Sequence, residues 1–205
     1  RMGVPDDKLI TIHNFVKPQL FRQASGNGDY VLYFGRLEKI KGIFTLLEAA
    51  TLLPHIPFLI IGKGQNSDEL KRCAESRCLK NIQFLDFVSG EKLENIIAQC
   101  RFSVLPTEWA ETFGLTVLET FMKGRPVIAS KIGGVQEIIE DKKTGFFFSP
   151  GNCVELASLI EYLWSNPEIC RKMGEEGQKH ALTAFGPDVH YEKLIQVYEQ
   201  VLGRN

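Results

Sequence analysis

The sequence predicts an α/β domain built on a Rossmann-like, doubly wound parallel sheet of about six strands. Two observations lead to this prediction. Apolar runs of strand length alternate along the chain with longer amphipathic segments of helix length. The short runs are rich in Val, Ile, Leu and Phe without polar alternation, which is typical of parallel strands covered by helices on both faces.

The expected elements alternate through most of the chain. We expect strands at residues 30–34, 58–61, 82–85, 102–105, 127–129 and 146–148. We expect helices at residues 43–53, 67–78, 89–99, 115–123, 154–164, 168–184 and 188–202.

Boundary residues agree with several of these helices. Ser89 stands where an N-cap is expected, and Asn152 followed by Glu155 resembles a capping box. Gly124 followed by Pro126 is a helix stop before the next apolar run. No internal repeat or low-complexity segment interrupts the alternation.

Composition narrows the class of partner. The 205 residues are 44% hydrophobic and 24% charged, which is ordinary for a globular domain. The net charge of −1, with both signs interspersed, provides no basic stripe for nucleic acid. No apolar run approaches the ~18 residues of a membrane span, and no leader pattern is present, so we expect a cytoplasmic protein.

The cysteines do not form a recognisable metal or disulfide pattern. Neither a C-x-x-C pair nor a nearby histidine accompanies them, so we expect reduced, structural thiols. The five are Cys73, Cys78, Cys100, Cys153 and Cys170.

The beginning of the chain differs from the rest. Residues 8–13 form a short β-like stretch, and a polar loop follows through residues 26–29. We expect residues 1–28 to be a linker and entry strand arriving from an upstream domain. Residues 29–185 would then form the main domain.

Three familiar phosphate and esterase motifs are missing. After the second expected strand the chain has Gly62-Lys63-Gly64, but Ser67 stands where the third glycine of a dinucleotide fingerprint belongs. Neither a Walker P-loop nor a G-x-S-x-G elbow occurs. Hydride transfer, P-loop hydrolysis and esterase chemistry are therefore disfavoured.

Cationic groups suited to a phosphate follow the first expected strand. Gly35 and Arg36 come directly after it, and Lys41 precedes a helix that begins after Gly42. An Arg fork, a Lys point charge and free helix N–H groups together suit a diphosphate. The alternative is that Arg36 and Lys41 are solvated loop charges.

Two carboxylates flank a second helix opening. Glu111 lies in the loop after the fourth expected strand, Gly114 opens the helix, and Glu119 follows about one turn later. Carboxylates accept hydrogen bonds from hydroxyls, so each could hold part of a sugar. Since parallel sheets bind ligands at the carboxyl ends of their strands, we expect these groups near Arg36 and Lys41.

Two weaker signals follow the second and third expected strands. Gly62 and Gly64 would permit close backbone approach by a ligand, although a plain turn explains them equally well. The loop around Val88 could face a planar base, or could be an ordinary connection between strand and helix.

Taken together, these residues resemble the C-terminal, donor-binding half of retaining GT-B glycosyltransferases of family four, the glycosyl transferases group 1. The resemblance covers about residues 8–200. It rests chiefly on the E-x7-E element from Glu111 to Glu119 with Phe113-Gly114 inside it. The supporting motifs are Gly35-Arg36-Leu37 with Lys41-Gly42, Gly62-Lys63-Gly64, Phe84-Leu85, Gly124-x-Pro126, Gly133-Gly134-x-x-Glu137 and Gly145.

The resemblance implies roles for individual residues. Arg36 and Lys41 would bind the donor diphosphate and stabilise the leaving group, and Glu111 would hold the transferred sugar; these three form the expected catalytic set. Glu119 would hold the ribose. The remaining expected donor-binding residues are Gly35, Gly62, Gly64, Val88, Phe113, Gly114 and Leu115.

It also implies a reaction and partners. The donor would be a UDP- or GDP-sugar, transferred with retention and without a metal or other cofactor to a glycan or lipid-linked acceptor, as in O-antigen or capsule synthesis. The acceptor would sit on an upstream domain, residues 186–205 would form a helix crossing back to it, and the full-length protein could associate peripherally with the membrane. Alternatives are a non-catalytic nucleotide-sugar-binding module and a GT-B epimerase or phosphorylase.

Two positions depart from the family pattern. Asp86 stands where a glycine is usual, which changes the loop expected to face the base. Asn14-Phe15-Val16 replaces the common Asn-Gly-Val, a change that we expect to affect only the linker.

Overall fold

The computed structural model describes residue 5, residues 8–16 and residues 26–203. Its centre is a six-stranded parallel sheet with the strand order β3-β2-β1-β4-β5-β6. The strands are β1 (Val31–Phe34), β2 (Phe58–Ile61), β3 (Ile82–Leu85), β4 (Phe102–Leu105), β5 (Val127–Ser130) and β6 (Gly145–Phe148). The predicted Rossmann-like sheet is confirmed.

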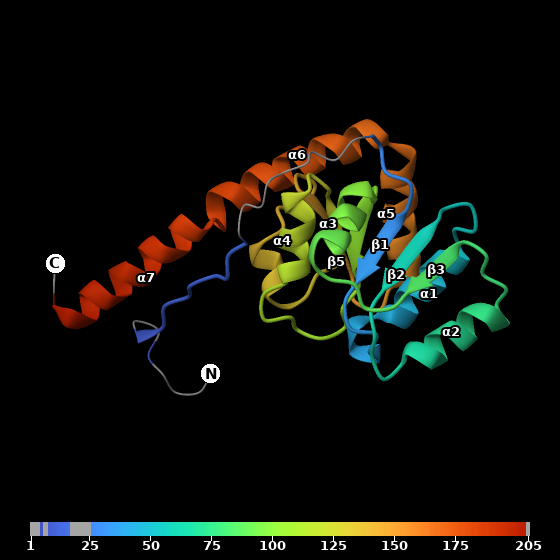
Figure 1. The fold of residues 1–205 in the computed structure, drawn as a ribbon, viewed down its shortest axis with the longest axis horizontal. Coiled ribbons are helices and arrows are strands. Elements are labelled where there is room, and N and C mark those ends of the chain that lie inside the picture. The colour runs from blue at the N-terminus through green and yellow to red at the C-terminus, as the bar shows by residue number, and fades with distance from the viewer. Residues whose placement is uncertain (1–4, 6–7, 17–25, 204–205) are drawn as a thin grey trace.

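Seven α-helices of the described chain accompany the sheet (Figure 1). They are α1 (Ile43–Thr51), α2 (Ser67–Ser76), α3 (Gly90–Gln99), α4 (Leu115–Met122), α5 (Cys153–Ser165), α6 (Pro167–Ala184) and α7 (Pro187–Leu202). Two short 3-10 helices, η2 (Lys39–Lys41) and η3 (Gly133–Glu137), were not predicted. Each is one turn or little more, too short to leave a hydrophobic period in the sequence.

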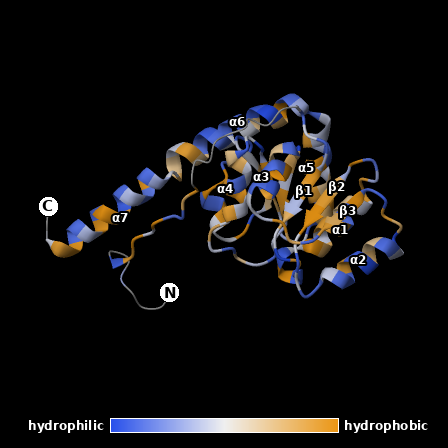
Figure 2. Ribbon diagram, in the orientation of Figure 1, coloured by the Kyte–Doolittle hydropathy of each residue, from blue (hydrophilic) through white to orange (hydrophobic). Residues whose placement is uncertain are grey.

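Alternate side chains of one strand face opposite layers of helices. Val31 and Tyr33 of β1 pack in the core that contains α1 and α5, whereas Leu32 and Phe34 pack with Ile97 of α3. A third cluster joins α4 and α6 to β5. The uniformly apolar strands are therefore explained by burial on both faces, visible as the orange centre of Figure 2.

Two boundary predictions can be checked in detail. The Asn152 side chain accepts a hydrogen bond of 3.1 Å from the Glu155 N–H and thereby caps α5, while the Glu155 carboxylate accepts from the Ser149 N–H at 2.8 Å. Ser89 occupies the N-cap of α3, but its side chain makes no capping hydrogen bond.

The entry strand expected at residues 8–13 is not formed, because that segment pairs with no strand of the sheet. Residues 13–16 instead contact the junction of α6 and α7. The Val16 N–H donates to the Phe185 carbonyl at 3.3 Å. The His13 carbonyl accepts a hydrogen bond of 2.7 Å from Nδ1 of the His190 ring. Much of the predicted linker, residues 1–4, 6–7 and 17–25, lies outside the described residues.

The helix expected at the C-terminus is present as α7, which runs beyond the sheet and buries none of its residues (Figure 1). All five cysteines are free thiols, as expected. None of the described helices is long and apolar enough to cross a membrane.

Helix α6 can lie against the end of α4 only because Gly174 has no side chain. A Cβ there would lie 1.9 Å from the carbonyl oxygen of Gly124. Glycine to alanine in a helix ordinarily stabilises by roughly 0.5–1 kcal/mol, because alanine is the better helix former.

We therefore predict the opposite sign for Gly174→Ala: a loss of about 2 kcal/mol of unfolding free energy, because backbone atoms must separate. Urea denaturation followed by circular dichroism measures it. Lys172→Ala, at an exposed position of the same helix, is the control and should change stability by less than about 0.5 kcal/mol. A stabilising Gly174→Ala would contradict this account of the α4–α6 contact.

Candidate functional site

A cavity of about 300 Å³ opens at the carboxyl ends of β1 and β4. The strand order reverses between these two strands, and ligands of open α/β sheets bind at such a switch point. The lining residues are Asn14, Tyr33, Phe34, Gly35, Arg36, Lys41, Leu105, Glu111, Thr112, Phe113, Gly114, Leu115 and Thr116. We call this the first cavity.

An ion pair joins the two loops that form the first cavity. The Lys41 ammonium, from η2, contacts the Glu111 carboxylate, from the loop after β4. Both side chains are largely buried, with 16% and 17% of their surface exposed. The structure thus brings together two groups that the sequence separates by 70 residues.

Arg36 lines the same cavity from the end of β1. Its guanidinium donates to Glu38 at 3.0 Å, and 64% of the side chain is exposed. The backbone beside it is fixed, because the buried Tyr33 hydroxyl donates to the Arg36 carbonyl at 2.7 Å. Burial, and then the Glu111 and Glu38 carboxylates, raise the pKa of Tyr33, so this phenol stays neutral.

The first turn of α4 faces the first cavity. Gly114 is the N-cap with φ of 113°, a conformation that favours glycine, and Leu115 and Thr116 begin the helix. Helix N-termini present unpaired N–H groups and partial positive charge. The arrangement therefore suits an anionic ligand.

Phe113 belongs both to the lining of the first cavity and to the hydrophobic core. It lines the first cavity, but its ring is 93% buried and packs at 5.8 Å from the Phe185 ring and 5.7 Å from the His13 ring. His13 also bonds the Glu137 carboxylate at 2.7 Å. Phe113 thus anchors the loop in the core while Gly114 and the residues that follow it line the cavity.

A second cavity, of about 430 Å³, adjoins the first and shares Leu115 with it. It lies between α3 and α4, and residues 15 and 16 of the N-terminal segment close one side. Its lining residues are Phe15, Val16, Gly90, Leu93, Glu94, Ile97, Leu115, Glu119, Met122 and Lys123.

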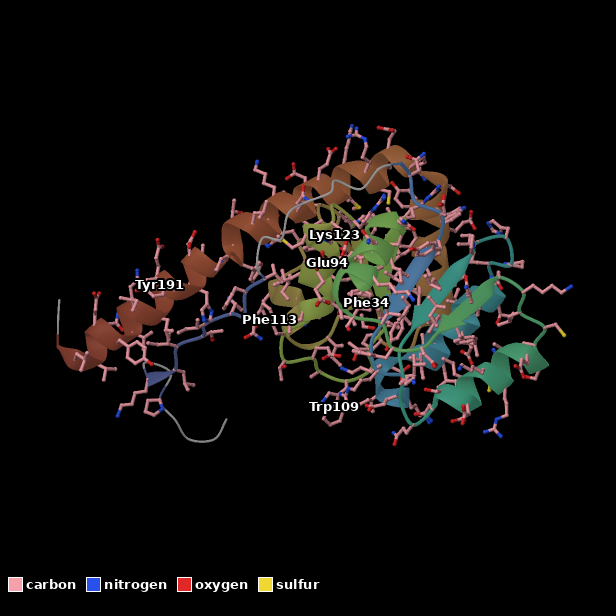
Figure 3. The ribbon with its side chains drawn as sticks, in the orientation of Figure 1. Phe34, Glu94, Trp109, Phe113, Lys123 and Tyr191 are labelled. Carbon is pink, nitrogen blue, oxygen red and sulfur yellow. The ribbon has the colours of Figure 1, made fainter. Side chains whose placement is uncertain are left out.

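Glu119 lies in this second cavity, and Glu111 in the first, so the two carboxylates do not share one site. Desolvation by the surrounding protein, and then the Glu94 carboxylate, raise the pKa of Glu119 above its ordinary value, although the residue keeps an exposed surface. Glu94 in turn pairs with the Lys123 ammonium at 3.0 Å (Figure 3).

Gly62 and Gly64 do not line either cavity, and their contact with a ligand stays a prediction. Their close approach is to the protein's own β1 loop. A Cβ at Gly62 would lie 1.8 Å from the Gly35 carbonyl oxygen, and one at Gly64 would lie 2.3 Å from the Leu37 carbonyl oxygen. These glycines position the loop that carries Arg36.

Val88 is also absent from both linings; it packs partly buried on the cluster around α3, while Gly90 and Leu93 reach the second cavity. Asp86, the departure from the family pattern, lies 3.4 Å from Lys63. The other departure reaches beyond the linker: Asn14 lines the first cavity and Phe15 the second.

Sequence reasoning missed several lining residues. Tyr33 and Phe34 end a buried strand and looked like core, and Thr112 and Thr116 stand inside the recognised motif without a signal of their own. Glu94, on α3, and Lys123, directly after α4, are 29 residues apart, so only the fold brings them together. In the part of the chain that the structure describes, no group of three or more His, Cys, Asp or Glu could hold a metal ion.

Comparison with known proteins agrees with this geometry. The family model of the glycosyl transferases group 1 matches residues 18–180. The O-antigen chain mannosyltransferase C of Escherichia coli is 29% identical over 192 residues, which cover 93% of this chain and 51% of the relative. The chain spans about half the length of the first curated relatives that it matches.

Solved structures show the same fold. Anabaena HepE in complex with UDP and glucose aligns with a TM-score of 0.75 at 25% identity, over 85% of this chain and 48% of that one. The C-terminal domain of a glycosyl transferase group 1 family protein from Francisella tularensis aligns with a TM-score of 0.74 at 24% identity, over 84% of this chain and 99% of that one. The chain belongs to the glycosyl transferases group 1 and has the Rossmann-like fold of a GT-B glycosyltransferase domain.

Proposed function

We propose that this chain is the donor-binding part of a retaining, metal-independent glycosyltransferase that uses a UDP- or GDP-sugar in polysaccharide synthesis. The observation that carries the proposal is the first cavity, where Lys41, Arg36 and the N-terminus of α4 meet Glu111. Two relatives support it: one is named an O-antigen chain mannosyltransferase, and another was crystallised with UDP and glucose.

The two cavities suit the parts of a nucleoside diphosphate sugar. The diphosphate would lie in the first cavity against Arg36, Lys41 and the first N–H groups of α4. The transferred sugar would bond Glu111, and the ribose would bond Glu119 in the adjoining cavity. Leu115, which lines both cavities, marks the boundary between these parts.

The reaction would depend on stabilising a leaving group. When the bond between the sugar and the diphosphate breaks, negative charge grows on the phosphate oxygens. Fixed cations and helix N–H groups aimed at those oxygens lower the free energy of the transition state. We assign this role to Arg36, Lys41 and the start of α4. An acceptor, with an upstream domain to hold it, would complete the enzyme.

Calorimetric titration of this chain with UDP, GDP and ADP tests the proposal. We expect weak binding of at least one of the three; binding of none would refute the donor site.

In the full-length protein, Glu111→Ala should reduce transfer strongly. Unchanged transfer would instead favour a non-catalytic nucleotide-sugar-binding module.

Lys41→Ala should raise the Kd for the bound nucleoside diphosphate by about tenfold or more, since it removes a charged hydrogen bond and leaves Glu111 to repel the phosphates. Lys39→Ala is the matched control: this lysine lies on the same short helix, is exposed, and lines neither cavity. Calorimetry at low salt measures both. Equal increases in Kd for the two variants would contradict a direct contact of Lys41 with the phosphates and would leave it only a share in the general positive potential of the loop.

Glu119→Ala should remove the preference for a ribose. The unmodified chain should bind UDP or GDP about tenfold more tightly than the 2′,3′-dideoxy nucleotide, because two hydroxyls can donate to the carboxylate. In Glu119→Ala the two affinities should become equal, whereas Glu91→Ala, at an exposed position on α3 outside both cavities, should keep the difference. A preference that survives in Glu119→Ala would place the ribose elsewhere.

Glu119→Gln should raise the melting temperature at neutral pH. Because the pKa of Glu119 is higher in the folded chain than in the unfolded one, ionisation of this group costs stability as pH rises through the shifted pKa. The gain in melting temperature should shrink on acidification below the ordinary pKa of a glutamate, where the carboxyl is protonated in both states. Scanning calorimetry at neutral and acidic pH measures it; a gain independent of pH would contradict the electrostatic cause.

A further inference from the structure

Trp109 is an exposed indole in the loop that also carries Glu111. It lies in the loop after β4, and 64% of its surface is accessible. Figure 3 shows its side chain pointing away from the body of the domain, at the edge where the strands end. Ile40, which is 43% exposed, belongs to the chain segment that pairs with this loop.

The loop around Trp109 is tightly held. The fully buried Thr107 hydroxyl donates to the Trp109 carbonyl at 3.1 Å and accepts from the Trp109 N–H at 3.4 Å. The Glu108 N–H donates to the Ile40 carbonyl at 2.9 Å, and the Thr45 hydroxyl donates to the Glu108 carboxylate at 2.6 Å. The exposure of Trp109 is therefore imposed by the fold.

The same contacts join the segment that carries Trp109 to the segment that carries Lys41. Trp109 precedes Glu111 by two residues, and Ile40 precedes Lys41 by one, so the two exposed apolar residues belong to the same two chain segments as the ion pair. The Glu111 carbonyl accepts a hydrogen bond of 2.7 Å from the Gly134 N–H. This bond holds the loop at the end that follows Trp109.

The exposed apolar surface is small. Among the neighbours along both segments, Glu38, Lys39, Glu108 and Thr112 are polar, and the exposed Ala110 adds only a methyl group. Patches that bind a macromolecule are usually several hundred Å² of contiguous apolar surface. One indole face and one isoleucine side chain, rimmed by polar groups, match the size and character of a single sugar ring.

We propose that Trp109 is a stacking platform for a sugar ring of the acceptor, which it holds against the donor sugar at Glu111. This inference rests on the proposed function, since it places the acceptor relative to the donor. A pyranose ring presents C–H groups on one face, and these pack on the electron-rich face of an indole by dispersion and quadrupole attraction. The hydroxyls at the ring edge remain free to meet carboxylates and water.

Nuclear magnetic resonance of the two indole N–H groups tests this proposal on the present chain. Trp164, the second tryptophan, packs beneath Arg101 at 4.1 Å and serves as an internal reference. We would titrate methyl α-D-mannopyranoside and methyl α-D-glucopyranoside in the presence of UDP or GDP. The Trp109 signal should shift saturably at millimolar glycoside while the Trp164 signal stays, with Trp109→Phe identifying each signal.

Matched variants sharpen the result. Trp109→Ala should weaken glycoside binding by about tenfold or more, because truncation removes the stacking surface. Tyr191→Ala, at an equally exposed aromatic position on α7, should leave it unchanged. Absence of a shift with both glycosides, equal shifts of both indoles, or equal losses in the two variants would overturn the platform.

Nucleotide affinity separates this proposal from the previous one. Trp109→Ala should keep the affinity for UDP or GDP; a comparable loss would make Trp109 part of the donor site and overturn its role with the acceptor. Sedimentation velocity should give the same mass for both forms, and a change would assign the indole to a contact between chains. If the unmodified chain binds no nucleotide yet Trp109 responds to glycosides, the donor proposal alone fails.

Discussion

The candidate site depends on one ion pair, between Lys41 and Glu111, because it joins loops from the two strands at which the sheet reverses its order. Neither loop forms the first cavity alone. Close backbone packing beneath the pair keeps the loops in register: Gly42 has φ of 66°, and a Cβ there would lie 1.7 Å from the Pro106 carbonyl oxygen. The charged groups can therefore meet only in a backbone that leaves no room for a side chain at that point.

Much of this fold could be predicted because its signals are local and consistent. The strands are mostly apolar and most of the helices are amphipathic, so all six strands and seven helices were found within about two residues at each end. The entry strand predicted at residues 8–13 is not formed, and the reason is physical. An extended apolar segment becomes a strand only where the edge of a strand is free to pair with it, and here residues 13–16 pack against the α6–α7 helix junction instead.

The candidate site could be predicted less completely. Arg36, Lys41, Glu111 and Gly114 line one cavity as the sequence indicated, because residues at the carboxyl ends of parallel strands necessarily converge. The ligand contact of Gly62 stays a prediction, because a glycine that admits a ligand and one that admits the protein's own backbone look alike in a sequence. The Glu94–Lys123 pair and the exposure of Trp109 depend on how helices and loops pack, and no local pattern encodes either.

Electrostatics explain why this chain should hold a donor only weakly by itself. Each cation proposed for the diphosphate already has a carboxylate partner, Arg36 with Glu38 and Lys41 with Glu111. A diphosphate entering the first cavity must compete with those carboxylates, so the net attraction is smaller than two free cations would provide. The sugar changes the balance, because its hydroxyls can donate to Glu111 while the ammonium turns its other protons to phosphate. Sugar and diphosphate would then bind cooperatively in the proposed site, since each would satisfy one half of an ion pair that the other disturbs. An acceptor ring on Trp109 would add exclusion of water from the pair and so strengthen the remaining charge interactions where the bond breaks.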